Sequence, residues 1–121
     1  MTNQQILDIS SAHLLKQNKR AGIRDKRFEP TGVQAQYYAA NGDKCAIGCL
    51  IPKDKYDREC ENTPASVLGV AGLAKLGVEL EDANGLAFVT ELQVIHDSRE
   101  VFSWRYCLTQ LARKYRLQVN F

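Results

Sequence analysis

The most constraining feature of this sequence is a run of apolar residues at helical spacing near its C-terminal end. Within residues 98–115, apolar side chains recur at intervals of mostly three or four positions: Val101, Trp104, Leu108, Leu111, Ala112 and Tyr115. This spacing places them on one face of an α-helix, which another element must cover. Asp97, with Glu100 three residues later, matches a capping box, so we expect Asp97 to cap this helix. The segment predicts a helix packed onto a hydrophobic core.

Other segments also have the periodicity or the boundary residues of helices, namely residues 3–19, 64–76 and 82–96. Thr2 or Asn3 offers a side-chain oxygen that caps the first of them. Thr63 followed by Pro64 favours the start of the second, because proline loses no hydrogen bond at the first helical position. The expected buried faces are Ile6, Ile9 and His13 on the first, Val67, Leu68 and Ala71 on the second, and Leu86, Val89, Gln93 and His96 on the third.

A hairpin is predicted at Asn41-Gly42, because both residue types tolerate the positive φ angles of a type I′ turn. Residues 34–40 and 43–47 are the expected antiparallel strands. The predicted fold is therefore α+β: a mainly helical single domain over residues 1–121, with about four helices and one small antiparallel hairpin.

Bulk properties limit the class of protein. No apolar run approaches the roughly 20 residues that cross a membrane. The stretch "MTNQQILDIS" lacks the basic and apolar regions of a secretory signal, so we expect a cytoplasmic protein with reduced cysteines. Both ends are net basic and residues 45–100 are net acidic. This pattern fits either an oriented encounter with a charged partner or pairing of the ends with the middle.

The stretch "KCAIGCLIP" raises the question of what Cys45 and Cys49 do. Free cysteine is among the most buried residue types, so we expect interior packing, with Gly48 allowing close backbone approach and no metal or cofactor. One alternative is a zinc site formed by Cys45, Cys49, Cys60 and His96, although zinc sites more often add a second tight pair. Another is a reactive thiol assisted by His96 and Asp97. Burial of His96 and capping by Asp97 explain these two residues without catalysis.

Two carboxylate pairs, Glu59/Glu61 and Glu81/Asp82, lie in polar stretches and are expected to be solvated rather than catalytic. The phosphate-binding motifs G-x-x-x-x-G-K-[ST] and G-x-G-x-x-G do not occur. The sequence therefore contains no catalytic signature, and we expect a protein that is not an enzyme.

A basic, glycine- and proline-containing stretch is predicted to form an exposed loop at about residues 20–33. Arginines and aromatic rings dominate the energetics of protein interfaces. The expected partner-binding residues are Arg20, Arg24, Lys26, Arg27, Tyr37 and Phe102. Cations can also bind the phosphates of single-stranded nucleic acid while aromatic rings stack on its bases. Single-stranded nucleic acid is therefore an alternative partner.

The order of these motifs along the chain resembles that of a set of known sequences. The blocks "NGDKCAIGCLIP" and "LQVIHD", followed by Trp104 and "LARKYRL", resemble a set of short proteins encoded mainly by bacteriophages and prophages. These share a G-x-K-C-A-[IV]-G-C-L-I-P block and a later L-Q-x-I-H-D block. The resemblance covers most of residues 11–117, and the basic stretch at 20–32 departs from it as an insertion. It implies no activity and no site residue.

The resemblance implies a phage context, in which small accessory proteins often bind and block one host protein. We therefore expect a phage-encoded accessory protein that binds and modulates or inhibits a host macromolecule in the host cytoplasm, and countering a host defence system is one such role. The alternatives are a small enzyme or metal- or ligand-binding protein using Cys45, Cys49 and His96, and a nucleic-acid-binding protein using the basic loop. The sequence leaves the oligomeric state open.

Overall fold

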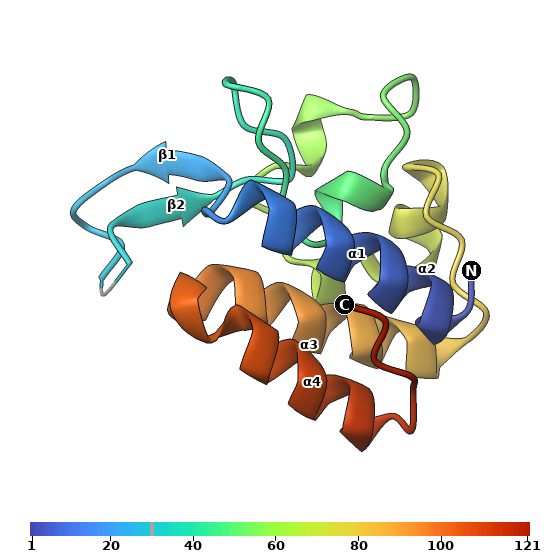
Figure 1. The fold of residues 1–121 in the computed structure, drawn as a ribbon. Coiled ribbons are helices and arrows are strands. Elements are labelled where there is room, and N and C mark those ends of the chain that lie inside the picture. Colours follow the sequence, from blue (N-terminus) through green and yellow to red (C-terminus); the bar gives the residue numbers. More distant parts are fainter. Residues whose placement is uncertain (30) are drawn as a thin grey trace.

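A computed structural model describes residues 1–29 and 31–121. Its α-helices are α1 (Asn3–Gln17), α2 (Ala65–Lys75), α3 (Ala83–Ser98) and α4 (Trp104–Lys114). Strands β1 (Gly22–Arg24) and β2 (Val33–Ala35) pair antiparallel (Figure 1). Short 3-10 helices occupy Gly48–Leu50, Arg58–Cys60 and Val101–Ser103. The prediction of a mainly helical α+β fold with one small hairpin is confirmed.

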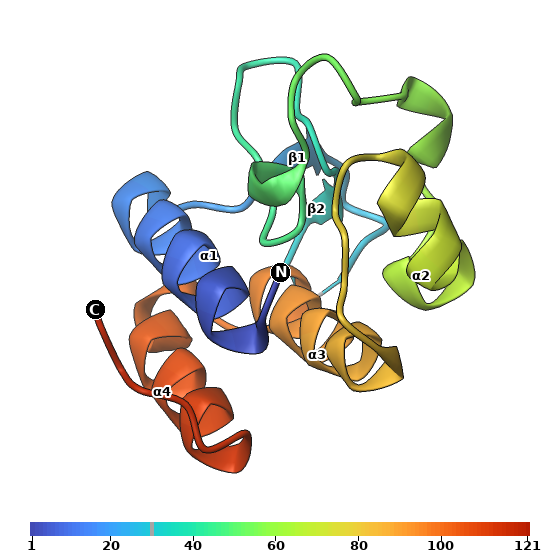
Figure 2. The ribbon, with the colours of Figure 1, turned by 90° about the vertical axis from the view of Figure 1, so that its right-hand side faces the viewer.

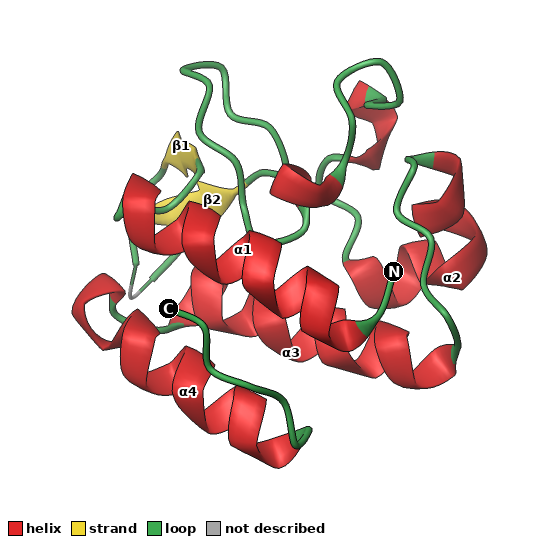
Figure 3. Cartoon of the chain, turned by 45° about the vertical axis from the view of Figure 1, so that its right-hand side comes forward, coloured by secondary structure: helices red, strands yellow, loops and turns green. Residues whose placement is uncertain are grey.

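Helix α3 is the centre of the helical layer and contacts α1, α2 and α4. Figure 2 shows α1 and α4 on one side of α3 and α2 on the other. The hairpin projects from the end of this layer where α1 ends and α4 begins (Figure 1). The loops that contain the first two 3-10 helices lie on the side of the layer away from α4 (Figure 3). In the described part of the chain, no helix is both long and apolar enough to cross a membrane.

The core confirms the face predicted for α4. Its largest fully buried side chains are Trp104, Phe88, Ile6, Leu7, Leu14, Ile47, Leu73, Leu92, Leu108, His96, Val78 and Val89. Helix α4 places Trp104, Leu108, Leu111 and Ala112 in the interior. Apolar burial at about 25 cal/mol per Å² makes this interface the main stabilising contribution of α4.

Helix α1 begins as predicted but buries a different stripe. Thr2 caps it, and the reciprocal hydrogen bond from Gln5 completes a capping box. Ile9 is 44% exposed, so its expected burial is wrong. The buried stripe, Ile6, Leu7, Ser10, Ser11 and Leu14, is rotated relative to the predicted one. Ser10 is tolerated inside because its Oγ donates to the Ala46 carbonyl oxygen over 2.7 Å.

Helix α2 is broken at Gly69, whose φ of 69° and ψ of −178° are not helical. The break changes the direction of the first turn relative to the rest. Val67, which is 72% exposed, and Ala71, which is also exposed, were both predicted to be buried; the buried residues of α2 are Ala65 and Leu73. Pro64 rather than Thr63 precedes the first helical residue.

The hairpin position predicted from Asn41-Gly42 is wrong. Gly42 has φ 95°, but Asn41 is not among the described residues with a positive φ. A type I′ turn needs both angles positive. Asn41 instead accepts a hydrogen bond from the Asp43 backbone N–H through its side chain, at 3.0 Å. Only one isolated bridge, Tyr38 with Lys44, remains of the expected ladder.

The observed hairpin lies in the stretch that was predicted as a loop. Gly22, Ile23 and Arg24 pair with Ala35, Gln34 and Val33, respectively. Thus residues 20–33 are not simply a loop: β1 and the start of β2 give the segment a fixed register. Pro30, in the connection, lies outside the described residues.

The segment after the bridge packs as tightly as the cysteine block predicted. Cys45, Ala46 and Ile47 are wholly buried. A Cβ added at Gly48 would overlap the carbonyl oxygen of Tyr37. The glycine therefore permits the backbone contact between this segment and the chain at Tyr37, as expected.

The junction between α3 and α4 differs from the prediction. Asp82 caps α3 by accepting from the Gly85 N–H. Asp97 belongs to the last turn of α3 and does not cap the next helix, and Glu100 precedes the 3-10 helix Val101–Ser103. The Asp97 carboxylate is engaged by neighbouring side chains of its own helix instead.

Candidate functional site

The thiols of Cys45, Cys49 and Cys60 lie in surroundings that keep them protonated. Cys45 is wholly buried and accepts from the Gly48 N–H at 3.3 Å, and burial raises the pKa of this thiol far above its usual range. Cys49 donates to the Ala46 carbonyl oxygen, and burial raises its pKa to about 11. Burial also raises the pKa of Cys60 to about 11. A nucleophilic cysteine needs the opposite shift.

The placement of the metal-binding candidates does not produce a metal site. Across residues 1–29 and 31–121, no three His, Cys, Asp or Glu side chains are placed to share an ion. Cys45 and Cys49 are in neighbouring turns, but Cys60 and His96 do not complete a ligand set with them. The four cysteines are free thiols.

His96 is wholly buried, and both of its ring nitrogens have partners. Nε2 accepts a hydrogen bond from the Ala21 backbone N–H at 2.9 Å. Because Nε2 provides the lone pair, Nδ1 carries the proton of the neutral ring and donates to Asp97 Oδ1 at 2.6 Å. The imidazole therefore has no free lone pair with which to deprotonate Cys45, and its role is to hold Ala21 against α3.

Asp97 receives a second hydrogen bond on the same oxygen. Gln93 Nε2, one turn earlier in α3, donates to Asp97 Oδ1 at 2.7 Å. The side chain of Asp97 is 36% exposed, so these two bonds orient a carboxylate that reaches solvent.

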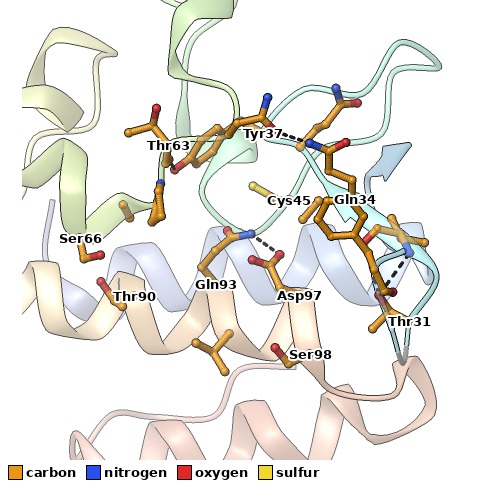
Figure 4. A pocket seen from close by; sticks show the side chains of 18 of the residues that line it. Thr31, Gln34, Tyr37, Cys45, Thr63, Ser66, Thr90, Gln93, Asp97 and Ser98 are labelled. Atoms are coloured by element: carbon orange, nitrogen blue, oxygen red, sulfur yellow. Dashed lines mark hydrogen bonds between the residues drawn. The ribbon is translucent and has the colours of Figure 1, made fainter. Parts of the chain in front are cut away.

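This carboxylate lines a cavity of about 650 Å³ between β2, the segment around Thr63 and α3. Figure 4 shows Gln93 and Asp97 extending from α3 toward Cys45 and Tyr37 on the far side. Thr90, Ser66 and Ser98 lie along the same cavity (Figure 4). The sequence did not reveal this site, because its lining comes from separate stretches, within 28–29, 31–37, 62–66 and 90–98 and at Cys45, that share no local motif.

Tyr37 is an interior residue, so its predicted place on an exposed binding surface is wrong. It is 7% exposed, and its hydroxyl donates to the Thr63 carbonyl oxygen at 2.6 Å. Its backbone N–H donates to Glu61 Oε1. Burial raises the pKa of the Tyr37 hydroxyl far above its usual range.

Glu61 was expected to be solvated, and the structure contradicts this. Its two carboxylate oxygens accept from the backbone N–H groups of Tyr37 and Tyr38 and from the Tyr56 hydroxyl. Glu61 thus joins the 3-10 helix Arg58–Cys60 to the chain that follows β2. The rings of Tyr38 and Tyr56 stack with centroids 4.0 Å apart above this joint.

The predicted basic residues divide into paired and unpaired cations. Arg24 and Lys26 are exposed, and the described residues offer neither of them an ion pair. Arg27 forms a bidentate pair with Asp25, with a shortest distance of 2.7 Å. This pairing raises the pKa of Arg27 and lowers that of Asp25. Arg20 is anchored, since its Nη2 donates to the Arg99 carbonyl oxygen.

A second hollow, of about 850 Å³, brings several of these cations together along the hairpin, from Lys19 and Arg20 at its base to Lys26 in the connection between its strands. Its cationic lining residues are Lys19, Arg20, Arg24 and Lys26. Val101 also lines it, and the next residue, Phe102, is 88% exposed. We call Arg20, Arg24, Lys26 and Phe102, with the hollow beside them, the hairpin-base surface. Arg27 and Tyr37 do not line this hollow.

Three comparisons with known proteins found no match to this chain. No protein-family model matches the chain. No curated protein and no solved structure matches it either.

Proposed function

We propose that this chain is a small phage-encoded accessory protein that binds a host protein through its hairpin-base surface and modulates or inhibits it. The observation that carries the proposal is that the unpaired Arg24 and Lys26 line the same hollow as Val101, whose neighbour in sequence, Phe102, is almost fully exposed. Exposed arginines and aromatic rings are typical anchors of protein interfaces. The phage context comes from the resemblance of the sequence blocks.

The charge of the surface indicates the kind of partner. Arg24 and Lys26 are not neutralised within the described residues, whereas Arg27 and Lys19 are paired with Asp25 and Asp43. An acidic patch on the partner complements the unpaired cations and accelerates the encounter. A bacterial defence protein with such a patch, met in the host cytoplasm, is the partner we propose to test first.

The chemistry of the interior supports binding without catalysis. Burial raises the pKa of Cys45 and Cys49, which opposes thiolate formation. The lone pair of His96 is committed to the Ala21 N–H. A nucleophile–base pair therefore has no support among these residues.

Affinity capture from a host lysate, followed by binding measurements with the purified captured protein, tests the proposal. The variant Arg24→Glu/Lys26→Glu reverses two unpaired charges and should lower affinity at least tenfold. Lys53→Glu/Lys55→Glu makes the same change of net charge on an exposed loop that does not line the hollow, and should keep the affinity within about twofold. Equal affinities of the two double variants would remove the hairpin-base surface from the binding site.

Single-stranded nucleic acid is a second candidate partner, favoured by the four cations that line the hollow. Phosphates would contact the cations and a base would stack on Phe102. Binding to a labelled single-stranded oligonucleotide would then weaken steeply as salt rises. An absence of binding at low salt would exclude this candidate.

A further inference from the structure

We propose that the cavity between β2 and α3 binds a small organic cation, an ammonium or amidinium group on an apolar body, with Asp97 as its counter-ion. This inference is independent of the proposed host-protein binding. The lining of the cavity and that of the hairpin-base hollow have only Thr31 and Val33 in common among the described residues.

The charge of the lining sets the sign of the ligand. The charged residues that line the cavity are the carboxylates Glu29 and Asp97, and the described lining contains no lysine, arginine or histidine. The chain as a whole has a formal net charge of +2. The charged side chains of the described lining are thus all negative, although the protein as a whole is basic. Such a cavity favours a cation and disfavours an anion.

Asp97 is oriented but not neutralised. Both hydrogen bonds that position it, from Gln93 and His96, fall on Oδ1. His96 is neutral when Nε2 accepts from Ala21, so it donates a hydrogen bond without cancelling the carboxylate charge. Within the described residues, Oδ2 accepts no hydrogen bond and no lysine or arginine pairs with Asp97.

The position of Asp97 on its helix strengthens this preference. Asp97 lies in the last turn of α3, which ends at Ser98. The C-terminal end of a helix carries partial negative charge, which favours a nearby cation. The fixed carboxylate and the helix end therefore act on a bound cation in the same direction.

The other residues that line the cavity indicate the chemistry of the rest of the ligand. Apolar side chains face the cavity from each of its sides: Phe28, Val33, Ala35, Pro64, Ala65 and Val94. Polar groups lie at Thr90, Ser66 and Ser98 (Figure 4). A volume of about 650 Å³ is within the range of small-molecule sites. One aromatic ring or a short aliphatic chain bearing a single cationic group fits this combination.

The test is a titration of the ¹⁵N-labelled protein with three compounds of nearly equal size. Binding is monitored through the NMR chemical shifts of the backbone amides. Benzamidine is cationic, benzamide is its neutral counterpart and benzoate is anionic. Benzamidine should give saturable shifts at amides of residues 63–66 and 94–98 and bind at least tenfold more tightly than benzamide. Benzoate should give none. The proposal is overturned if benzamidine causes no saturable shift at about 10 mM, or if benzamide binds equally well.

Two variants assign the binding to this cavity. Asp97→Asn keeps an oxygen that accepts from Gln93 and His96 but removes the charge, and should reduce benzamidine affinity at least tenfold. Val94 lines the cavity and is 44% exposed, so the larger side chain of Val94→Trp should occupy part of the cavity. This variant should weaken the binding of benzamidine and of benzamide alike. Unchanged benzamidine affinity in Val94→Trp overturns the proposal even if Asp97→Asn does not fold.

Discussion

The backbone N–H of Ala21 donates a 2.9 Å hydrogen bond to Nε2 of the wholly buried His96. The bond joins the start of the hairpin to the last turn of α3, across 75 positions of sequence. The His96 ring also packs against Trp104, with centroids 5.7 Å apart. One side chain therefore fixes the relative positions of the hairpin, α3 and α4.

Replacement of His96 by alanine should lower the free energy of unfolding by about 3 kcal/mol. The change leaves a cavity beside Trp104 and a buried Ala21 N–H without a partner. His13→Ala is the matched control, because His13 is only partly buried and contacts the Lys44 carbonyl oxygen. Its expected cost is about 1 kcal/mol. Urea unfolding measures both, and equal costs would contradict the role of the Ala21 bond.

Local sequence patterns predicted the helices because each one is specified by residues close together in the chain. The spacing of Trp104, Leu108 and Leu111 requires no knowledge of the rest of the fold. The buried stripes of α1 and α2 were less predictable. Ser10 is buried because Ala46 offers an acceptor, and Val67 is exposed because Gly69 interrupts the helix.

The hairpin was predicted at the wrong place because the turn signal at Asn41-Gly42 is local, whereas the observed pairing of β1 with β2 joins segments about ten residues apart. Asn41-Gly42 does form a turn, with Gly42 N–H donating to the Ala39 carbonyl oxygen. Beyond it, the Cys45 N–H still donates to the Tyr37 carbonyl oxygen, but the chain then turns into the 3-10 helix Gly48–Leu50 and the ladder ends. The actual strands contain Gly22 and Ala35, residues of low strand propensity, so propensity alone could not identify them.

Replacement of Gly48 by alanine should prevent stable folding. A Cβ there overlaps the Tyr37 carbonyl oxygen, and neither backbone can move without opening the block at Cys45–Ile47. We expect a loss of about 3 kcal/mol or more. Gly32→Ala is the control: nothing lies within 4 Å of the added Cβ, but φ is 69°. Its cost should be about 1–2 kcal/mol. Thermal or urea unfolding that ranks Gly32→Ala above Gly48→Ala would refute the close-packing explanation.

Stability should fall between about pH 9 and pH 11. Burial raises the pKa of the Cys49 thiol from 9.0 to about 11. In this interval the unfolded chain loses the proton and the folded chain keeps it, so folding becomes less favourable as pH rises. The slope per group is at most about 1.4 kcal/mol per pH unit.

Urea unfolding of the wild type and Cys49→Ala, measured at pH 7 and again at pH 10.5, isolates this contribution. The stability difference between the two proteins should shrink at the higher pH, because the variant has no thiol at this position to ionise. A difference independent of pH would mean that Cys49 ionises equally in both states.

The cavity and the Glu61 joint show why sites are harder to predict than helices. Thr90, Gln93 and Asp97 recur along α3 in the pattern of an ordinary polar helix face. They line a cavity only because β2 and the segment at Thr63 are placed opposite them. Nothing in the local sequence around either place specifies such a juxtaposition.

Glu61→Gln should destabilise the protein by about 2 kcal/mol. An amide has only one accepting oxygen, so its NH₂ group must face a donor, either the Tyr37 N–H or the Tyr38 N–H with the Tyr56 hydroxyl. Glu59→Gln, on an exposed residue two positions earlier, should stay within about 0.5 kcal/mol of the wild type. Chemical denaturation distinguishes the two. A neutral Glu61→Gln would mean that its carboxylate is solvated after all.

Phe102→Ala should separate binding from stability. The ring is 88% exposed, so its removal should change the free energy of unfolding by no more than about 0.5 kcal/mol. If Phe102 is an anchor of the hairpin-base surface, the same change should weaken binding to the captured host protein about tenfold or more. Val67→Ala removes apolar surface from a side chain that is 72% exposed on α2, and should alter neither property. Calorimetric affinity and urea unfolding of the three proteins provide the comparison. Equal binding by Phe102→Ala and Val67→Ala would leave the exposed ring without a role in the interface, and the charges at Arg24 and Lys26 would have to supply the affinity alone.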